Sequence, residues 1–214
     1  MKKVIPIVLV LALGLATEVA KADFTFGTPT NLGPPVNSSS KDCIPNISAD
    51  GMSLYFASNR PGGYGNQDLW VTTRVTTRST TEYSWGEPVN LGPIVNGSAD
   101  DVSPAISADG LSLYFDSTRS GGSGNLDIWV ITRETVDEDW STPEWLGPSV
   151  NSSAIDSSPF ISADGLELYF ARGQAWNTDR GIWPEHRLPG CPFWRPVSKP
   201  VSKCTYSDST TSLL

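Results

Sequence analysis

Asp101-Val-Ser-Pro-Ala-Ile-Ser-Ala-Asp-Gly-Leu-Ser-Leu-Tyr-Phe115 is the central copy of a stretch that recurs at residues 42–56 and 156–170 of this 214-residue chain. Each copy follows a shorter motif, Leu-Gly-Pro-x-Val-Asn, which ends at residues 37, 96 and 151. The first two copies continue into a glycine-rich loop and then Asp-Leu/Ile-Trp-Val. Tandem similarity of this kind indicates one supersecondary unit that packs against copies of itself.

Each unit is predicted to contain four short strands. In the first copy these cover residues 45–48, 52–58, 68–73 and 85–91, and their alternating aromatic and β-branched residues suit a pleated sheet. The Asp-Gly pair at residues 50–51 predicts a tight two-residue hairpin turn with positive φ at both positions. Pro88 suits an edge strand because proline cannot donate to a ladder.

Large apolar side chains alternate onto both faces of these strands, as Leu54, Tyr55 and Phe56 illustrate. A small sheet that must be covered on both sides and recurs in tandem is a β-propeller blade. The predicted fold class is therefore all-β: an incomplete β-propeller of about three four-stranded blades. The repeats span residues 23–171, with blades at about 42–91, 101–146 and, in part, 156–179.

These motifs resemble the WD40-like PD40 repeat of TolB-type β-propellers. The resemblance is carried by residues 42–71 and 101–130, and in part by 156–170. It is specific for architecture but not for function, since members of the family serve as protein-interaction modules, as accessory domains of enzymes and as uncharacterised exported proteins. The chain departs from the six blades of the TolB type because it is too short to supply them.

Three aspartates, Asp42, Asp101 and Asp156, precede the innermost strands. The resemblance implies that they ring one end of a central channel, which is a usual partner face, whereas the structural alternative is that each accepts backbone hydrogen bonds within its own turn. Arg60 and Arg119 recur just before the glycine loops. They either pair with a nearby aspartate or present a guanidinium group at the surface.

Metal and sugar binding are weaker predictions. The glycine loops that end at Asp68 and Asp127 supply oxygen ligands of the kind Ca²⁺ uses, but one carboxylate per loop is a poor provision, so no cofactor is expected apart from this weak Ca²⁺ candidate. Trp85 and Trp140 begin the outer strands and are candidates for exposed, sugar-stacking indoles, although packing is the alternative. No carboxylate pair stands out for acid–base catalysis.

The N-terminus has the pattern of a signal peptide. Lys2 and Lys3 precede an apolar run, and Ala20-Lys-Ala22 offers a cleavage site, so residues 1–22 are predicted to be removed and the product to be periplasmic or secreted, with no membrane association afterwards. The alternative is a retained anchor. A net charge of −8 gives no basic surface for a phosphate backbone, which argues against nucleic-acid binding.

The C-terminal residues 180–214 depart in composition from everything before them. We hypothesise that a frameshift or gene truncation near residue 180 replaced the rest of a longer propeller, with a natural capping tail as the alternative. Export permits a disulfide between Cys191 and Cys204, while Cys43 is predicted to be a buried thiol.

Three functional hypotheses follow. The first is an exported, non-enzymatic propeller module, a fragment of a longer propeller, that binds a protein or glycan in the envelope or extracellular space. The second is an accessory or remnant domain of a secreted carbohydrate-active enzyme. The third is a degenerate product without function, because an unclosed set of blades exposes apolar faces.

Overall fold

The computed structural model of the chain describes residues 27–76, 83–173 and 181–186. The chain divides into two compact parts, Met1–Asn31 and Leu32–Leu214, and all the strands of the described residues lie in the second part. The predicted signal peptide and the Cys191–Cys204 disulfide fall outside the described residues. Among the residues that are described, no helix has the length and apolar character needed to cross a membrane.

The first repeat forms the first sheet, in the order β1 (Asp42–Ile47), β2 (Ser53–Ser58), β3 (Asp68–Thr76), β4 (Tyr83–Trp85). All pairs are antiparallel, and β5 (Val89–Asn90) also pairs with β3. The predicted fourth strand is therefore two short pieces. Residues 86–88 interrupt it, and Pro88 within them has no N–H for the ladder.

The second repeat forms the second sheet from β6 (Asp101–Ile106), β7 (Ser112–Ser117), β8 (Asp127–Thr132) and β9 (Glu144–Trp145). Its register repeats that of the first sheet, since Phe115 lies opposite Trp129 as Phe56 lies opposite Trp70. After β9 comes the single helical turn among the described residues, α1 (Gly147–Val150), which the strand-only prediction did not include. The two complete repeats thus fold into two separate sheets of the same architecture.

The third sheet contains β10 (Ile155–Ile161), β11 (Glu167–Gly173) and β12 (Gly181–His186). Phe170 lies opposite Trp183, the register that Phe115 and Trp129 hold in the second sheet. The prediction that the repeat pattern is lost after Asp179 is therefore wrong, because an inserted Arg-Gly pair hid the match of Ile182-Trp183 to Ile128-Trp129. The frameshift hypothesis stays a prediction, and the change of frame that it requires would lie beyond Trp183.

The hairpin turns differ in detail from the prediction. Gly51 has φ of 72° but Asp50 does not have positive φ, so the turn is not the predicted two-residue type. Instead Gly51 N–H donates to Ser48 O at 2.8 Å, while Asp50 Oδ1 accepts from Ser48 Oγ at 2.5 Å and from Met52 N at 2.9 Å. A turn that an aspartate side chain closes in this way is an Asx-type turn.

Each innermost strand carries the same β-bulge. The register shifts in β1, β6 and β10 at one equivalent place, where Ile44, Ser103 and Ser158 take φ of 52°, 53° and 55°. A left-handed conformation is unfavourable for a residue with a Cβ, and most of all for a β-branched one. The bulge is thus a built-in feature of the unit, and it is most strained at Ile44.

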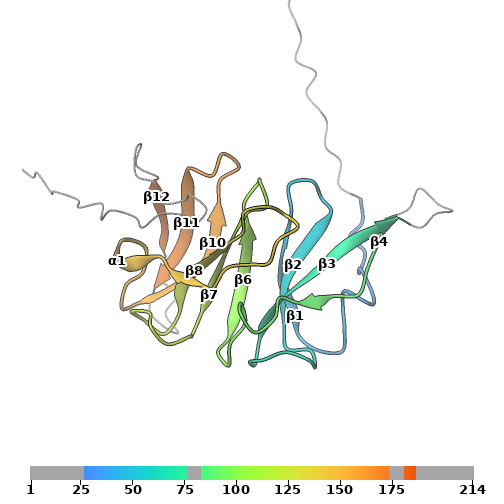
Figure 1. The fold of residues 1–214 in the computed structure, drawn as a ribbon, viewed down its shortest axis with the longest axis horizontal. Helices are drawn as coiled ribbons and strands as arrows, with labels where there is room; N and C mark the ends of the chain where they lie inside the picture. Colours follow the sequence, from blue (N-terminus) through green and yellow to red (C-terminus); the bar gives the residue numbers. More distant parts are fainter. Residues whose placement is uncertain (1–26, 77–82, 174–180, 187–214) are drawn as a thin grey trace, which may run out of the picture. The chain divides into compact units, whose positions relative to one another are not determined.

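The three sheets pack face to face in chain order, and Figure 1 shows them side by side from β1 to β12. One buried cluster joins the first and second sheets through side chains that include Tyr55, Leu69, Leu113, Phe115 and Ile131. A second joins the second and third sheets through Tyr114, Ile128, Val130, Leu168 and Phe170. Because the second sheet contributes to both clusters, both of its faces are core, as the blade prediction requires.

The asparagine of the Leu-Gly-Pro-x-Val-Asn motif ties the segment that leads into the next sheet to the third strand of the sheet before it. Asn96 is 1% exposed, accepts from Leu69 N–H at 2.9 Å and donates to Leu69 O at 3.0 Å. Asn151 makes the same pair with Ile128, at 2.7 and 2.9 Å. A side-chain amide mimics a backbone group in both bonds, and this explains why the motif ends in asparagine.

We predict that Asn96→Asp lowers the free energy of unfolding by about 3 kcal/mol, because a buried carboxylate would face the Leu69 carbonyl without a proton to donate. Chemical denaturation of the variant and the wild type measures the difference. Asn125→Asp, the same substitution at an exposed position, is the control and should change stability by less than about 0.5 kcal/mol. Equal effects at the two positions would contradict the role assigned to Asn96.

We further predict that Ile44→Gly raises the free energy of unfolding by about 1 kcal/mol, because glycine adopts a φ of 52° without steric cost. Ile47→Gly is the matched control, since Ile47 has nearly the same exposure, 48% against 46%, but does not have positive φ. Thermal denaturation should rank the two variants on opposite sides of the wild type. A loss at both positions would mean that the Ile44 side chain contributes more than its strain costs.

Candidate functional site

The predicted aspartates and arginines pair with one another. Arg60 Nη2 donates to Asp42 Oδ1 at 2.6 Å, and Arg119 Nη2 to Asp101 Oδ1 at 2.5 Å. Each arginine also donates through Nε to a serine hydroxyl and through Nη2 to the valine carbonyl of the preceding Leu-Gly-Pro-x-Val-Asn motif. Each guanidinium group therefore ties together three segments of its unit.

The third unit builds the same contact from a different position. Arg172 lies opposite Asp156 in the ladder, where Ser58 and Ser117 stand in the other units. Its Nε donates to Asp156 Oδ1 and its Nη2 to Val150 O, both at 2.6 Å. Sequence reasoning missed Arg172 because the Ser-x-Arg spacing is absent. The signal that identifies it is the strand register. Arg172 starts two residues earlier in its unit than the other two arginines do in theirs, and its guanidinium group reaches the same two acceptors, the aspartate and the valine carbonyl.

The guanidinium groups also cover aromatic rings. Arg60 lies 4.8 Å from the ring centre of Phe56 and 5.3 Å from that of Trp70, and Arg119 repeats both contacts at 5.0 and 5.3 Å. Arg172 lies 5.2 Å from Phe170. Cation–π contacts of this geometry favour a buried arginine over an exposed one. We therefore assign the repeated arginines to the scaffold.

Asp42 shows how strongly these contacts hold a carboxylate. Burial raises its pKa, but hydrogen bonds from Ser58, Arg60 and Ser38 outweigh burial and lower the pKa from 3.8 to about 2. The side chains of Asp101 and Asp156 are completely buried, and Gly97 N–H and Ser152 N–H donate to them. A partner reaches none of the three carboxylates without breaking an ion pair, which favours the structural alternative, and the partner-face hypothesis stays a prediction.

The glycine loops are closed by their own aspartates. Asp68 accepts from Tyr64 N–H at 2.9 Å and Gly65 N–H at 3.1 Å, and Asp127 accepts from Gly124 N–H at 3.0 Å. Both side chains belong to residues that are 1% exposed. No cluster of three potential metal-ligating side chains occurs in the described parts of the chain. The geometry thus accounts for both aspartates as loop caps, and the Ca²⁺ candidacy gains no support.

The two candidate tryptophans are half-buried and covered on a ring face. Arg74 lies 4.9 Å from the ring centre of Trp85, and Arg133 lies 4.2 Å from that of Trp140. Trp140 also packs against the cluster between the first and second sheets. Sugar stacking needs a free ring face, and Arg133 occupies one face of Trp140. It belongs instead to the wall of a hollow.

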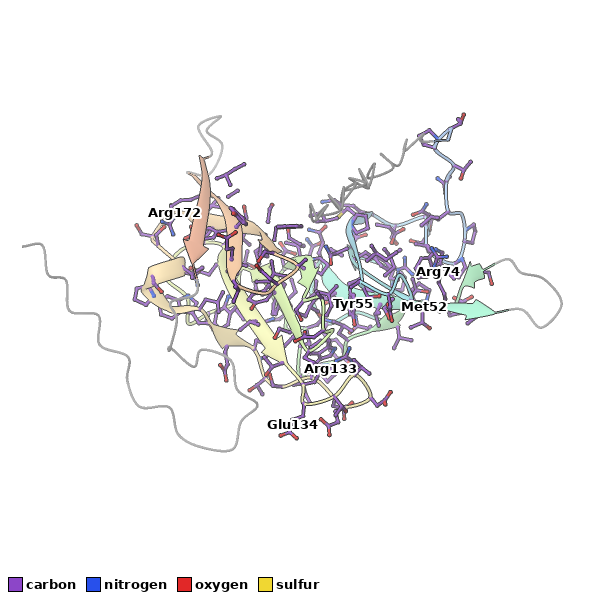
Figure 2. The ribbon with its side chains drawn as sticks, turned by 90° about the horizontal axis from the view of Figure 1, so that it is seen from above. Met52, Tyr55, Arg74, Arg133, Glu134 and Arg172 are labelled. Carbon is purple, nitrogen blue, oxygen red and sulfur yellow. The ribbon has the colours of Figure 1, made fainter. Side chains whose placement is uncertain are left out.

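This hollow, the interblade hollow, has a volume of about 410 Å³ and opens between the hairpin ends of the first and second sheets. Figure 2 labels Tyr55, from β2, and Arg133, which follows β8, among its walls. The lining combines apolar and aromatic side chains with polar groups; it includes Tyr55, Val71, Thr73, Ile106, Val136, Trp140, Asp50, Asp109 and Arg133. Of these, only Trp140 was singled out from the sequence as a binding residue.

Arg133 organises the hollow. Its Nε donates to Gly110 O at 2.9 Å and its Nη1 to Val136 O at 2.8 Å, so it fixes the loop that follows β8 against the hairpin turn between β6 and β7 of the same sheet. Burial raises the pKa of Tyr55, and the neighbouring Arg133 only partly opposes that rise. Tyr55 is therefore a neutral phenol at physiological pH. Hydrogen bonds from Ser48 and Met52 lower the pKa of Asp50, which keeps that carboxylate ionised.

The comparisons with known proteins assign no family. No protein-family model and no curated protein matches the chain. Among solved structures, it is similar to a protein assigned as TolB from Agrobacterium tumefaciens, with 20% identity over 72% of this chain and 47% of that one and a TM-score of 0.48. The chain spans less than half the length of that structure.

Two further structures are similar at lower identity. A TolB from Acinetobacter baumannii has 15% identity over 67% of this chain and 29% of that one, with a TM-score of 0.44. An alpha-L-arabinofuranosidase from Lactobacillus brevis has 13% identity over 70% of this chain and 53% of that one, with a TM-score of 0.42. These similarities do not distinguish among the functional hypotheses.

We predict that Asp42→Asn lowers the free energy of unfolding at neutral pH and that the difference from the wild type shrinks as the pH falls from about 4 to about 2. The sign follows from linkage: a lowered pKa stabilises the fold above the unfolded-state pKa, and the stabilisation is lost as the folded-state carboxylate is protonated. Urea denaturation at several pH values measures it. Asp137→Asn, in an exposed loop, should show no such trend, and a pH-independent difference at position 42 would contradict the ion-pair assignment.

Proposed function

We propose that this chain is an exported, non-enzymatic β-propeller module that binds a protein segment in the interblade hollow. The single observation that carries the proposal is the hollow itself, where two units place apolar walls, an ordered arginine and a half-buried tryptophan around about 410 Å³. Concave sites with mostly apolar walls and a few oriented polar groups are where proteins bind ligands. Export, to the periplasm or outside the cell, is supported by the N-terminal sequence pattern.

The lining favours a peptide over a glycan. The ring of Trp140 is covered by Arg133 on one side and packs on the core, so it contributes an edge and apolar bulk and not a stacking platform. Asp50 and Asp109 line the same hollow from the two hairpin turns. An apolar side chain that enters the hollow, next to a lysine or arginine that meets these carboxylates, is the segment that fits.

The same groups argue against catalysis at this place. A general acid must keep its proton near neutral pH. Hydrogen bonds from Ser48 and Met52 lower the pKa of Asp50, so this carboxyl group does not keep its proton near neutral pH. We accordingly assign binding and not glycoside hydrolysis to the hollow.

The test is a binding screen of the exported chain against a random-peptide library and a glycan array. We expect peptides with an apolar anchor beside a basic residue, and we expect Thr73→Arg, which fills the hollow from an exposed strand position, to weaken their binding at least about 10-fold. Trp140→Ala should weaken it similarly. Trp85→Ala is the matched control, since Trp85 also carries a stacked arginine but does not line the hollow.

Each outcome of the screen is decisive. Peptide binding that Thr73→Arg and Trp140→Ala abolish, and that Trp85→Ala leaves within about 2-fold, supports the proposal. Binding of glycans alone would overturn the assignment to a protein segment. Peptide binding that survives Thr73→Arg would show that the hollow is not the site.

A further inference from the structure

The innermost strands occupy equivalent positions but differ sharply in exposure. Ile106 in β6 is 8% exposed, whereas Ile47, at the same position of β1, is 48% exposed. Ala105 in β6 is 2% exposed, whereas Phe160, at the same position of β10, is 59% exposed. The central strand is thus covered on both sides, and each flanking strand has one open side.

The contact between the first and second sheets shows which neighbours the exposed sides of β1 and β10 lack. Ile106 lies in the buried cluster with Tyr55 of the first sheet, and its N–H donates to Asn46 Oδ1 at 3.0 Å. A residue at the position of Ile106 therefore adjoins the residue at the position of Asn46 on the sheet before it. The residue equivalent to Ile106 on the open side of β1 is Ile47, and the residue equivalent to Asn46 on the open side of β10 is Phe160.

We propose that two copies of this chain associate head to tail, with β1 of each copy packed on β10 and β11 of the other. The described chain carries both halves of one sheet-to-sheet contact, and both halves are apolar. The three sheets of the described residues are too few for a closed propeller, which has about four to eight blades. Two copies of the described residues supply six sheets, which falls within that range.

The proposed contact is heterologous, because a different surface of each copy takes part, and it occurs twice in a closed pair. Ile47 of one copy would adjoin Phe160 of the other, as Ile106 adjoins Asn46 within the chain. Burying these two side chains removes apolar surface that a soluble protein otherwise leaves open to aggregation. The inference does not depend on what occupies the interblade hollow.

Light scattering after size exclusion and sedimentation equilibrium test it on the full chain recovered after expression with its own N-terminal segment. We expect the wild type to have twice the mass of one chain. Ile47→Asp and Phe160→Lys, each alone, should weaken the dimer at least about 100-fold, because each places a charge against an apolar partner. Val89→Asp and Val89→Lys are the controls, since Val89 is 63% exposed and lies on the short edge strand β5.

Mixing the two charged variants is the decisive step. In a mixed pair one contact brings the two introduced charges, which are opposite in sign, against each other, and the other contact keeps the native Ile47 and Phe160. The mixture should therefore dimerise where neither variant does so alone. Far-UV circular dichroism and thermal denaturation confirm that each variant is folded. A symmetric contact of β1 with β1 would instead leave Phe160→Lys dimeric.

Three results would overturn the proposal. One is a monomeric wild type at about 100 μM, as expected if residues 187–214 or a different protein cover the open faces. Another is a dimer that Ile47→Asp and Phe160→Lys leave as tight as the Val89 controls do. The third is a mixture of folded, monomeric variants that stays monomeric.

Discussion

The structure depends on the requirement that every sheet be covered on both faces. Tyr55, Tyr114 and Tyr169 stand on one face of their strands, and the flanking leucines and phenylalanines stand on the other, so no sheet has a face suited to water. Where a neighbouring sheet is present, these side chains form a continuous core. Because the hydrophobic effect scales with apolar area removed from water, a single unit would leave most of that gain unrealised. The tandem repeat is the simplest solution to this constraint.

Polar groups set the geometry that the apolar faces leave undefined. Apolar packing is non-directional, but the amide of Asn96 can pair with Leu69 in only one register, and the fork of Arg119 must meet Asp101, Ser117 and a valine carbonyl together. The most repeated charged residues of the chain are thus scaffold residues. Their recurrence in every unit reflects a need that every unit shares. The binding proposed above instead uses a hollow between the first and second units.

The interblade hollow illustrates that division. Tyr55 belongs to the repeat, but the loop after β8 that carries Val136 differs from the equivalent part of the first unit, where β3 continues to Thr76. Arg133 and Trp140 have counterparts in Arg74 and Trp85, which make the same stacked pair but do not line this hollow. A site of this kind depends on which unit follows which. It is a property of the order of the units and not of the motif.

The sequence by itself determined the repeat, the strands, their two apolar faces and hence the blade architecture, because these follow from local periodicity and from the comparison of copies within one chain. It also offered the pairing of Arg60 with a nearby aspartate as one of two alternatives. Only the tertiary structure decided that these pairs are buried and that Arg172 substitutes for a missing Ser-x-Arg. It also decided that the third sheet has a third strand, β12, beyond Asp179. Those facts depend on register and on burial between units, which no spacing within a single unit encodes.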